Sequence, residues 1–167
     1  DAAPVIPAVV INEVLTHSGT SVDFIELFNP SGGEVNIGGW FLTDDPSVPK
    51  KFRIADATMI PGGNFLAIME TSFNPTPGLG TSFTLSADGE QVFLFSGDAM
   101  TNLTGYSHGF SFGASEQGVT FGRYINSLGE ELFPAQVAPT LGTNNSGPRV
   151  GPVVISEIMY HPAPNGD

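Results

Sequence analysis

Short apolar segments alternate with turn-forming residues along most of the chain. Stretches rich in Val, Ile, Leu and Phe are separated by Gly, Pro, Asn and Asp, which turn the backbone or interrupt pairing. No window keeps apolar residues at the three- and four-residue spacing of an amphipathic helix for long enough to predict one. We therefore expect strands at Val9–Leu15, Asp23–Asn29, Glu34–Ile37, Trp40–Asp44, Lys51–Ile54, Asn64–Met69, Ser82–Leu85, Gln91–Ser96 and Val119–Tyr124.

This pattern predicts an all-β domain, because many short strands with frequent turns are typical of an antiparallel β-sandwich. The turn Ala87-Asp88-Gly89-Glu90 suits a hairpin. The segment Phe24–Phe28 is nearly all apolar, so we expect a central strand buried on both faces. The expected core residues are Ile11, Val14, Ile25, Leu27, Trp40, Leu42, Phe65, Ala67, Val92, Leu94 and Phe121.

Two stretches do not fit the strand pattern. Thr71–Thr81 and Gly97–Gly118 are long and rich in Gly, Ser and Thr, so we expect both to be surface loops. Long loops on a rigid β scaffold often carry binding sites.

One sequence motif occurs twice. Val9–His17 (VVINEVLTH) returns as Val153–His161 (VVISEIMYH), and such self-similarity indicates modules in series. We expect a linker at residues 1–8, a β-sandwich domain at 9–145, a linker at 146–152, and the truncated first strand of a second, similar domain at 153–167. Val9–Leu15 should be an internal strand that begins the sandwich. Without its own sheet, segment 153–159 should add to an exposed strand edge of this domain or of a neighbouring molecule, or remain disordered.

The composition excludes several classes of partner. Five Lys and Arg against 17 Asp and Glu give a formal net charge of −12, which disfavours binding to nucleic acid and to anionic membranes. No apolar run approaches the roughly 18 residues that cross a bilayer, so we expect no membrane insertion. The chain has no cysteine, which excludes disulfides and thiolate metal sites.

One ordered set of motifs runs through most of the chain: Val10–Val14, Asp23–Pro30, Gly38–Asp44, Ile60–Leu66, Phe83–Ser86 with Gly89-Glu90, Phe121–Arg123 and Pro139–Asn144. Together these motifs resemble a bacterial lamin tail domain of the secreted, multidomain type. The resemblance implies an immunoglobulin-like antiparallel β-sandwich in a secreted multidomain protein, with no catalytic residues.

Two strings match catalytic motifs without their structural context. Gly109–Gly113 reads G-x-S-x-G around Ser111, but no helix follows, and the nearest histidine, His108, precedes the string. Ser47-Val48-Pro49-Lys50 reads S-x-x-K, but Pro49 opposes the helical turn that this motif requires. We therefore predict no catalytic residues and no enzyme activity.

Metal binding has weak support in the sequence. His17, His108 and His161 are scattered, whereas zinc needs several converging ligands. A calcium site could use Asp44 and Asp45 together with nearby aspartates, but aspartate at such positions usually closes turns. We therefore predict no metal and no cofactor. The aspartates considered with Asp44 and Asp45 are Asp23, Asp56 and Asp88.

Two residues are expected to be structural. Glu13 shares strand parity with Val9, Ile11 and Leu15, so we expect it to face the core and to be paired with Arg123 or Arg53, or with backbone groups. Glu157 occupies the same place in the second motif. Trp40 could be an aromatic platform for sugars, but we predict a core position.

The first functional hypothesis is a non-catalytic structural or interaction module of a larger, secreted or cell-surface bacterial protein. Its partners would be a protein, an extracellular glycan or the neighbouring domains of its own chain. The second hypothesis is a carbohydrate- or calcium-dependent adhesion module that uses loops 71–81 and 97–118. An enzyme built around Ser111 or clustered carboxylates is the least favoured.

Overall fold

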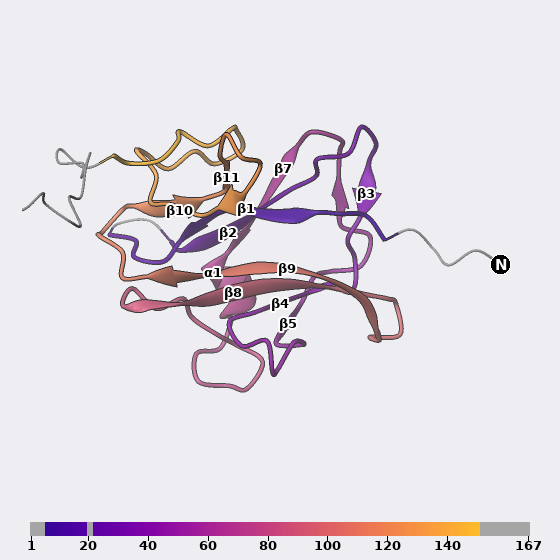
Figure 1. Cartoon of the computed structure of the whole chain (residues 1–167). Helices are drawn as coiled ribbons and strands as arrows, with labels where there is room; N and C mark the ends of the chain where they lie inside the picture. Colours follow the sequence, from indigo (N-terminus) through magenta and orange to yellow (C-terminus); the bar gives the residue numbers. More distant parts are fainter. Residues whose placement is uncertain (1–5, 20–21, 151–167) are drawn as a thin grey trace, which may run out of the picture.

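The computed structural model describes residues 6–19 and 22–150. The chain forms two antiparallel four-stranded sheets, which lie one above the other in Figure 1. In the first sheet the order is β10 (Thr120–Gly122), β1 (Val10–Leu15), β2 (Phe24–Phe28) and β7 (Phe65–Met69). In the second it is β5 (Phe52–Arg53), β4 (Phe41–Thr43), β8 (Gly89–Gly97) and β9 (Leu103–Gly113).

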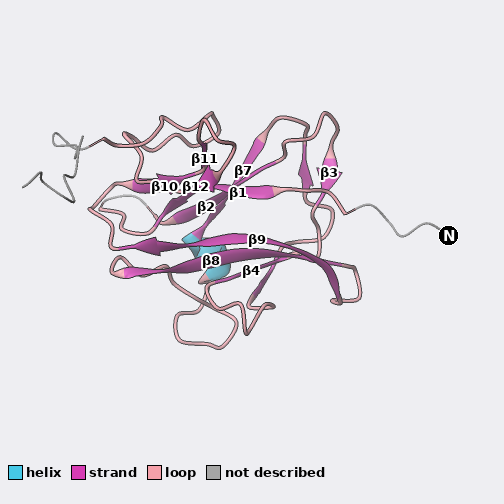
Figure 2. Ribbon diagram, viewed as in Figure 1, coloured by secondary structure: helices cyan, strands magenta, loops and turns pink. Residues whose placement is uncertain are grey.

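Smaller elements complete this β-rich structure, as Figure 2 shows. Two short strand pairs lie outside the main sheets: β3 (Val35–Asn36) with β6 (Met59–Ile60), and β11 (Tyr124–Ile125) with β12 (Glu131–Leu132). The only helix in the described residues is a single turn, α1 (Glu70–Phe73), so no helix there is long enough to cross a membrane. The immunoglobulin-like sandwich predicted from the sequence is confirmed.

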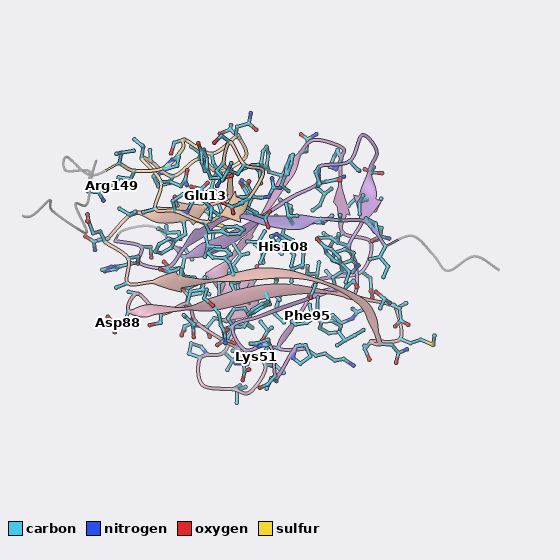
Figure 3. The ribbon with its side chains drawn as sticks, viewed as in Figure 1. Glu13, Lys51, Asp88, Phe95, His108 and Arg149 are labelled. Atoms are coloured by element: carbon cyan, nitrogen blue, oxygen red, sulfur yellow. The ribbon has the colours of Figure 1, made fainter. Side chains whose placement is uncertain are left out.

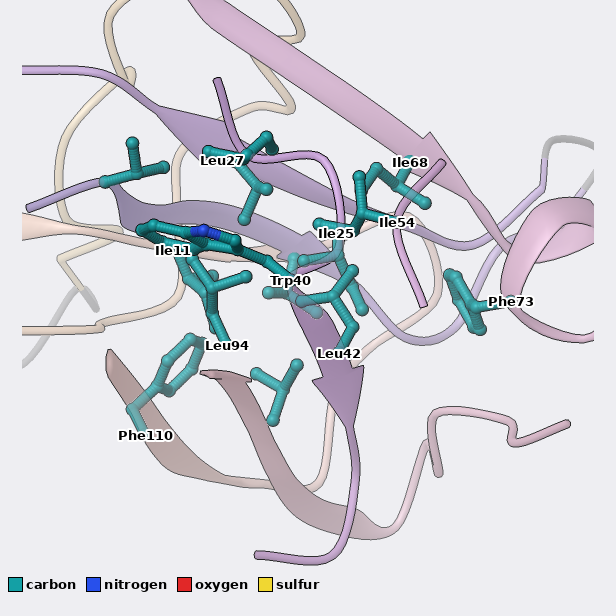
Figure 4. Close-up of a cluster of buried hydrophobic side chains, with 14 of the residues drawn as sticks. Ile11, Ile25, Leu27, Trp40, Leu42, Ile54, Ile68, Phe73, Leu94 and Phe110 are labelled. Carbon is teal, nitrogen blue, oxygen red and sulfur yellow. The ribbon is translucent and has the colours of Figure 1, made fainter. Parts of the chain in front are cut away.

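The hydrophobic core fills the space between the two sheets (Figure 4). Ile11, Ile25 and Leu27 enter it from the first sheet, and Leu42 and Leu94 from the second; all are fully buried. Burying each such side chain contributes about 1.5–3 kcal/mol. Trp40 is also buried, as predicted, with its ring centroid 5.8 Å from that of Tyr106.

Strand β1 is internal, as predicted, because it pairs with β10 on one side and β2 on the other. Strand β2 has buried residues on both faces, also as predicted, since Ile25 and Leu27 face the core while Phe24 and Glu26 are covered on the other side. The two edges of this sheet are β7 and β10.

The core assignments at Phe65 and Ala67 are wrong. Opposite β2, Leu66 pairs with Leu27 and Ile68 with Ile25, so these two residues point inward. Ala67 is exposed and Phe65 is half-buried on the outer face. Because all five residues of β7 are apolar, their sequence does not indicate which alternate set faces the core.

The prediction of a surface loop at Gly97–Gly118 is also wrong. Residues 103–113 form β9, which pairs with β8 along most of its length. Gly109, one of the small residues that suggested a loop, makes room for an aromatic neighbour: a Cβ at this position would lie 2.3 Å from Cδ1 of Phe93, its partner in the register. Glycine in a strand often marks such a close approach.

The segment Ser82–Leu85 was predicted as a strand and is not one, although two of its residues are buried. Phe83 and Leu85 belong to the core, and the Phe83 ring stacks on Phe73 of α1 with the centroids 4.7 Å apart. The rest of Thr71–Thr81, after α1, is the expected exposed loop. Several predicted strands are shorter than expected, and β6, β11 and β12 were not predicted as separate strands.

The described chain enters the sandwich near one end and leaves near the opposite end (Figure 1). Residues 147–149 are hydrogen-bonded to residues 135–137: Val137 N–H donates to Gly147 O at 3.1 Å, and Arg149 N–H to Ala135 O at 2.7 Å. The expected domain and linker boundaries remain predictions. The second motif, with Glu157 and His161, and the strand exchange expected of residues 153–159 lie outside the described residues.

Candidate functional site

A β-bulge at Asn12 turns Glu13 away from the hydrophobic core. Ile11 pairs with Leu27, and the next paired residue of β1 is Glu13, opposite Glu26, so Asn12 is the extra residue. Val14 therefore joins Ile11 on the inner face, and Glu13 lies beside Glu26 on the outer face. The prediction that Glu13 faces the core is wrong because simple alternation does not anticipate a bulge. Both carboxylates are nevertheless fully buried.

Residues 134–147, called here the C-terminal strap, cover this outer face. The strap first runs beside β10, where Gly122 N–H donates to Pro134 O at 3.1 Å and Gln136 N–H donates to Thr120 O at 2.8 Å. It then crosses over β1 and β2, and Figure 1 shows it on the side of the first sheet away from the second sheet. The strap both protects the β10 edge and removes Glu13 and Glu26 from water.

Glu13 binds the strap through its carboxylate. Thr140 donates from its backbone N–H to both oxygens at 3.1 Å, and from its hydroxyl to Oε2 at 2.9 Å. Thr120 of β10 donates its hydroxyl to Oε1 at 2.5 Å. The predicted backbone hydrogen bond is confirmed. The predicted arginine partners are wrong, because Arg123 pairs with Glu131 and Arg53 with Asp56.

Glu26 binds the strap two residues further along. Gly142 N–H donates to its Oε2 at 2.5 Å, and the Asn12 amide donates to its Oε1 at 2.8 Å. Burial raises the pKa of Glu26 above its usual value, and the nearby Glu13 carboxylate adds to this shift, while the bonds from Gly142 and Asn12 oppose it. Two adjacent buried carboxylates are costly, and the donors of the strap offset that cost. We call Glu13 and Glu26, together with the strap residues Thr140 and Gly142 that donate to them, the carboxylate clamp.

Asn145 ties the strap to the β-bulge. Its side-chain amide donates to Asn12 O at 3.1 Å and to Arg123 O at 2.9 Å, and its Oδ1 accepts from the Asn12 amide at 2.9 Å. At the bulge, Asn12 O accepts from Arg123 N–H at 2.7 Å and from the Asn145 amide. The bulge and the strap therefore stabilise one another.

Gly122 allows the strap to approach β10 closely. A Cβ at this position would lie 2.7 Å from the Gln136 side chain and 2.9 Å from Asn145 Nδ2. The Gln136 side chain is buried and donates to Gly122 O at 3.1 Å, while its Oε1 accepts Gly147 N–H at 2.9 Å. A residue with a side chain at position 122 would displace these bonds.

A pocket of about 270 Å³ opens beside the strap, at the end of β2. One wall is aromatic: Phe28 and Phe65 face each other across β2 and β7, with ring centroids 4.8 Å apart. The other wall is mainly polar and comes from the strap, from the chain after β10 and from the bulge of β1. The lining residues are Asn12, Phe28, Phe65, Arg123, Tyr124, Ile125, Asn144, Asn145 and Gly147.

His108 links the two sheets. Its Nδ1 accepts the Ile11 N–H at 3.0 Å, so Nε2 carries the proton and donates to Glu131 at 3.1 Å. Burial lowers the pKa of His108; the Glu131 carboxylate opposes this shift and Arg123 adds to it. In Figure 3, His108 lies between the sheets and Glu13 lies near the strap. His108 is a structural histidine that joins β9 to β1.

The catalytic strings do not form catalytic sites. Ser111 is exposed near the end of β9, and its three-residue separation from His108 puts the two side chains on opposite faces. The strand–turn–helix of a nucleophile elbow is missing from this part of the chain. Ser47 donates to Asp45 within a turn that also contains Pro49. The His17 ring contacts the backbone oxygen of Ser115, away from His108.

The aspartates considered for calcium lie in turns or ion pairs. Asp45 accepts from Ser47 and Asp23 from Ser18 N–H, while Asp44 pairs with Lys51 at 2.5 Å. The bonds from Ser47 hold the pKa of Asp45 below its usual value. Within residues 6–19 and 22–150, no three His, Asp or Glu side chains are placed to hold a metal ion together. Asp56 pairs with Arg53, and Asp88 is exposed.

The family follows from the sequence match and the sandwich together. A family model described as the Lamin Tail Domain matches residues 2–116, more than half of the chain. A search of curated proteins and a search of solved structures found no match. The matched region contains β1 to β9, and β10 and the strap follow it. The lamin tail domain is an immunoglobulin-like, non-catalytic module. The chain belongs to the lamin tail domain family.

Proposed function

We propose that this domain is a non-catalytic interaction and spacing module of a larger, secreted or cell-surface bacterial protein. The observation that carries the proposal is the path of the chain, which enters the sandwich near one end and leaves near the other (Figure 1). A domain with this geometry adds its length to a series of modules. The second copy of the β1 motif at Val153–His161 supports such a series.

The carboxylate clamp supports a directed exit of the chain. Thr140 and Gly142 are bound to Glu13 and Glu26, and residues 147–149 are hydrogen-bonded to residues 135–137. The chain therefore stays attached to the sandwich almost to residue 150. A short connection after that point would limit how far successive modules can rotate.

The positions of the candidate catalytic groups favour interaction over catalysis. Ser111 and His108 lie on opposite faces of β9, and the buried carboxylates Glu13 and Glu26 are occupied by strap donors. A hydrolytic site would need a nucleophile and a base within hydrogen-bonding reach.

The proposed spacing function can be tested on a longer piece of the natural chain, which runs to the end of the next module. Small-angle X-ray scattering should give a maximum dimension close to twice that of this domain alone, because the modules would be arranged end to end. A dimension only slightly larger than that of one domain would show folded-back modules and contradict the spacing function.

The proposed secreted or cell-surface location of the protein is tested separately, on intact cells of the source organism. An antibody against this domain should label unbroken cells or detect the protein in the medium. Labelling that appears only after lysis would contradict the secreted or cell-surface assignment. An antibody against a cytosolic protein is the control for cell integrity.

A further inference from the structure

We propose that the pocket between the Phe28–Phe65 pair and the C-terminal strap binds one neutral sugar residue of a glycan. This inference rests on the proposed interaction function and names its ligand class. It places the site on the outer face of the first sheet, rather than in the segments 71–81 and 97–118 considered from the sequence.

The aromatic wall of the pocket suits the apolar face of a sugar ring. Phe28 and Phe65 lie on the outer face, are half-buried, and stack with ring centroids 4.8 Å apart. Both line the open volume beside the strap. The face of an aromatic ring carries partial negative charge, which attracts the polarised C–H groups of a pyranose.

The polar wall offers hydrogen bonds of the kind that sugar hydroxyls use. Asn144 is exposed, and its side chain makes no hydrogen bond within the described residues, so its donor and its acceptor both remain available. Arg123 uses Nε for Glu131, which leaves N–H groups at the end of its guanidinium. The neighbouring Asn12 and Asn145 bind each other and keep this wall in place.

Charge and size favour a single neutral residue. The Arg123 guanidinium is balanced by Glu131, the buried Glu26 lies close by under the strap, and the whole chain has a formal net charge of −12. An extended anionic glycan would be repelled by this field. A volume of about 270 Å³ is just below the range of about 300–1,000 Å³ typical of pockets for drug-sized ligands, so it suits one sugar ring.

The test is an NMR titration of this chain with methyl glucoside, methyl galactoside, methyl mannoside and N-acetylglucosamine, each alone. At least one of these sugars should cause saturable shifts in the side-chain amides of Asn144 and Asn145 and in Arg123 Nε–H. Dissociation constants should be of the order of 1 mM, as few contacts are available.

Two variants identify the pocket, and each has a matched control. Phe65→Ala removes half of the aromatic wall and Asn144→Ala removes a free amide, so each should weaken binding about tenfold or more. Phe95→Ala removes a half-buried aromatic from the outer face of the other sheet, and Gln117→Ala an exposed amide from the loop before β10. Neither control should change binding.

Three results would overturn the sugar site. The first is the absence of saturable shifts with all four sugars up to about 100 mM, far above the expected constant. The second is binding that the two control variants weaken as much as the pocket variants do. The third is a preference for methyl glucuronide over methyl glucoside that Arg123→Gln abolishes, which would indicate an anion site. A negative result in these titrations would contradict the sugar site alone. The proposed spacing function and location have their own tests, so the two proposals can be told apart.

Discussion

The outer faces of the two sheets differ in what covers them. On the first sheet, Glu13 and Glu26 are fully buried beneath the strap. On the second sheet, Phe93 and Phe95 are half-buried and Ser107 and Ser111 are exposed. A covered face can therefore carry fully buried carboxylates, while an open face leaves phenylalanines half-exposed. What decides burial is a segment from elsewhere in the chain, not the strand itself.

The two faces also satisfy their polar groups differently. On the covered face, Glu13 and Glu26 are held by Thr120, Thr140, Gly142 and Asn12, because a buried carboxylate without donors is costly. On the open side of the molecule, solvent can hydrate the polar groups. The covered face should therefore be much more sensitive to loss of a single group.

The largest effect should come from removing the clamp. Glu13→Ala leaves the Thr140 N–H and two threonine hydroxyls without their acceptor, and should lower the free energy of unfolding by about 3 kcal/mol. The melting temperature should fall by roughly 6–12 °C. Urea denaturation and thermal melting measure both quantities.

Asp98→Ala is the matched control for Glu13→Ala. Asp98 accepts from Met100 N–H, Asn102 N–H and the Asn102 amide, but it lies in a turn at the surface. Its loss should destabilise clearly less than Glu13→Ala, since water replaces the missing acceptor. Equal losses for the two variants would remove the distinction between the covered and the open side.

A smaller loss should follow from forcing the strap away from β10. Gly122→Ala places a methyl group 2.7 Å from the Gln136 side chain, and should cost about 1–3 kcal/mol. Gly113→Ala, at the end of β9, meets nothing within 4 Å and should change stability little. Equal stability of the two variants in urea denaturation would mean that the strap does not pack on β10.

The smallest effect should be the pH dependence of stability that comes from His108, which links the two sheets. The pKa of His108 is lowered by burial, so the unfolded chain takes up a proton at this residue at a higher pH than the folded chain does. Stability contributed by neutral His108 is therefore present above the unfolded pKa of about 6.5 and is lost as the pH falls below it. Protonation would also place a hydrogen on Nδ1, where Ile11 N–H now donates.

His108→Asn isolates this contribution. Asparagine keeps an acceptor near the Nδ1 position but does not titrate, so the variant should lose less stability than the natural chain between pH 7 and pH 5. The comparison is needed because the raised pKa of Glu26 acts in the opposite direction: its contribution is present at low pH and is lost as the pH rises through that pKa. Parallel curves for the two proteins in urea denaturation would contradict the role of His108.

Much of the sandwich was predictable from local pattern. Leu42, Val92 and Leu94 lie in predicted strands, were expected in the core, and all are buried. Trp40 and the internal position of β1 were also predicted correctly. The errors at β7 and β9 have local causes: every residue of β7 is apolar, and Gly109 of β9 is small because it lies opposite Phe93.

The candidate site was much less predictable, because it depends on contacts between distant residues. A bulge at Asn12 reversed the expected direction of Glu13. Its partner Thr140 is more than a hundred residues away, as is Gly142 from Glu26. The segment Pro139–Asn144 was recognisable by its resemblance to a lamin tail domain, but nothing in its composition indicates that its backbone N–H groups bind carboxylates.

The central claim is that Glu13 and Glu26 hold the C-terminal strap as a part of the folded domain. Amide hydrogen exchange at Thr140 and Gly142 tests it most directly, because these two N–H groups donate to the buried carboxylates. We predict strong protection at both positions in the natural chain, and a loss of that protection in Glu13→Ala while Leu94 in β8 stays protected. Exchange of Thr140 and Gly142 at the rates of an unstructured chain would contradict the claim.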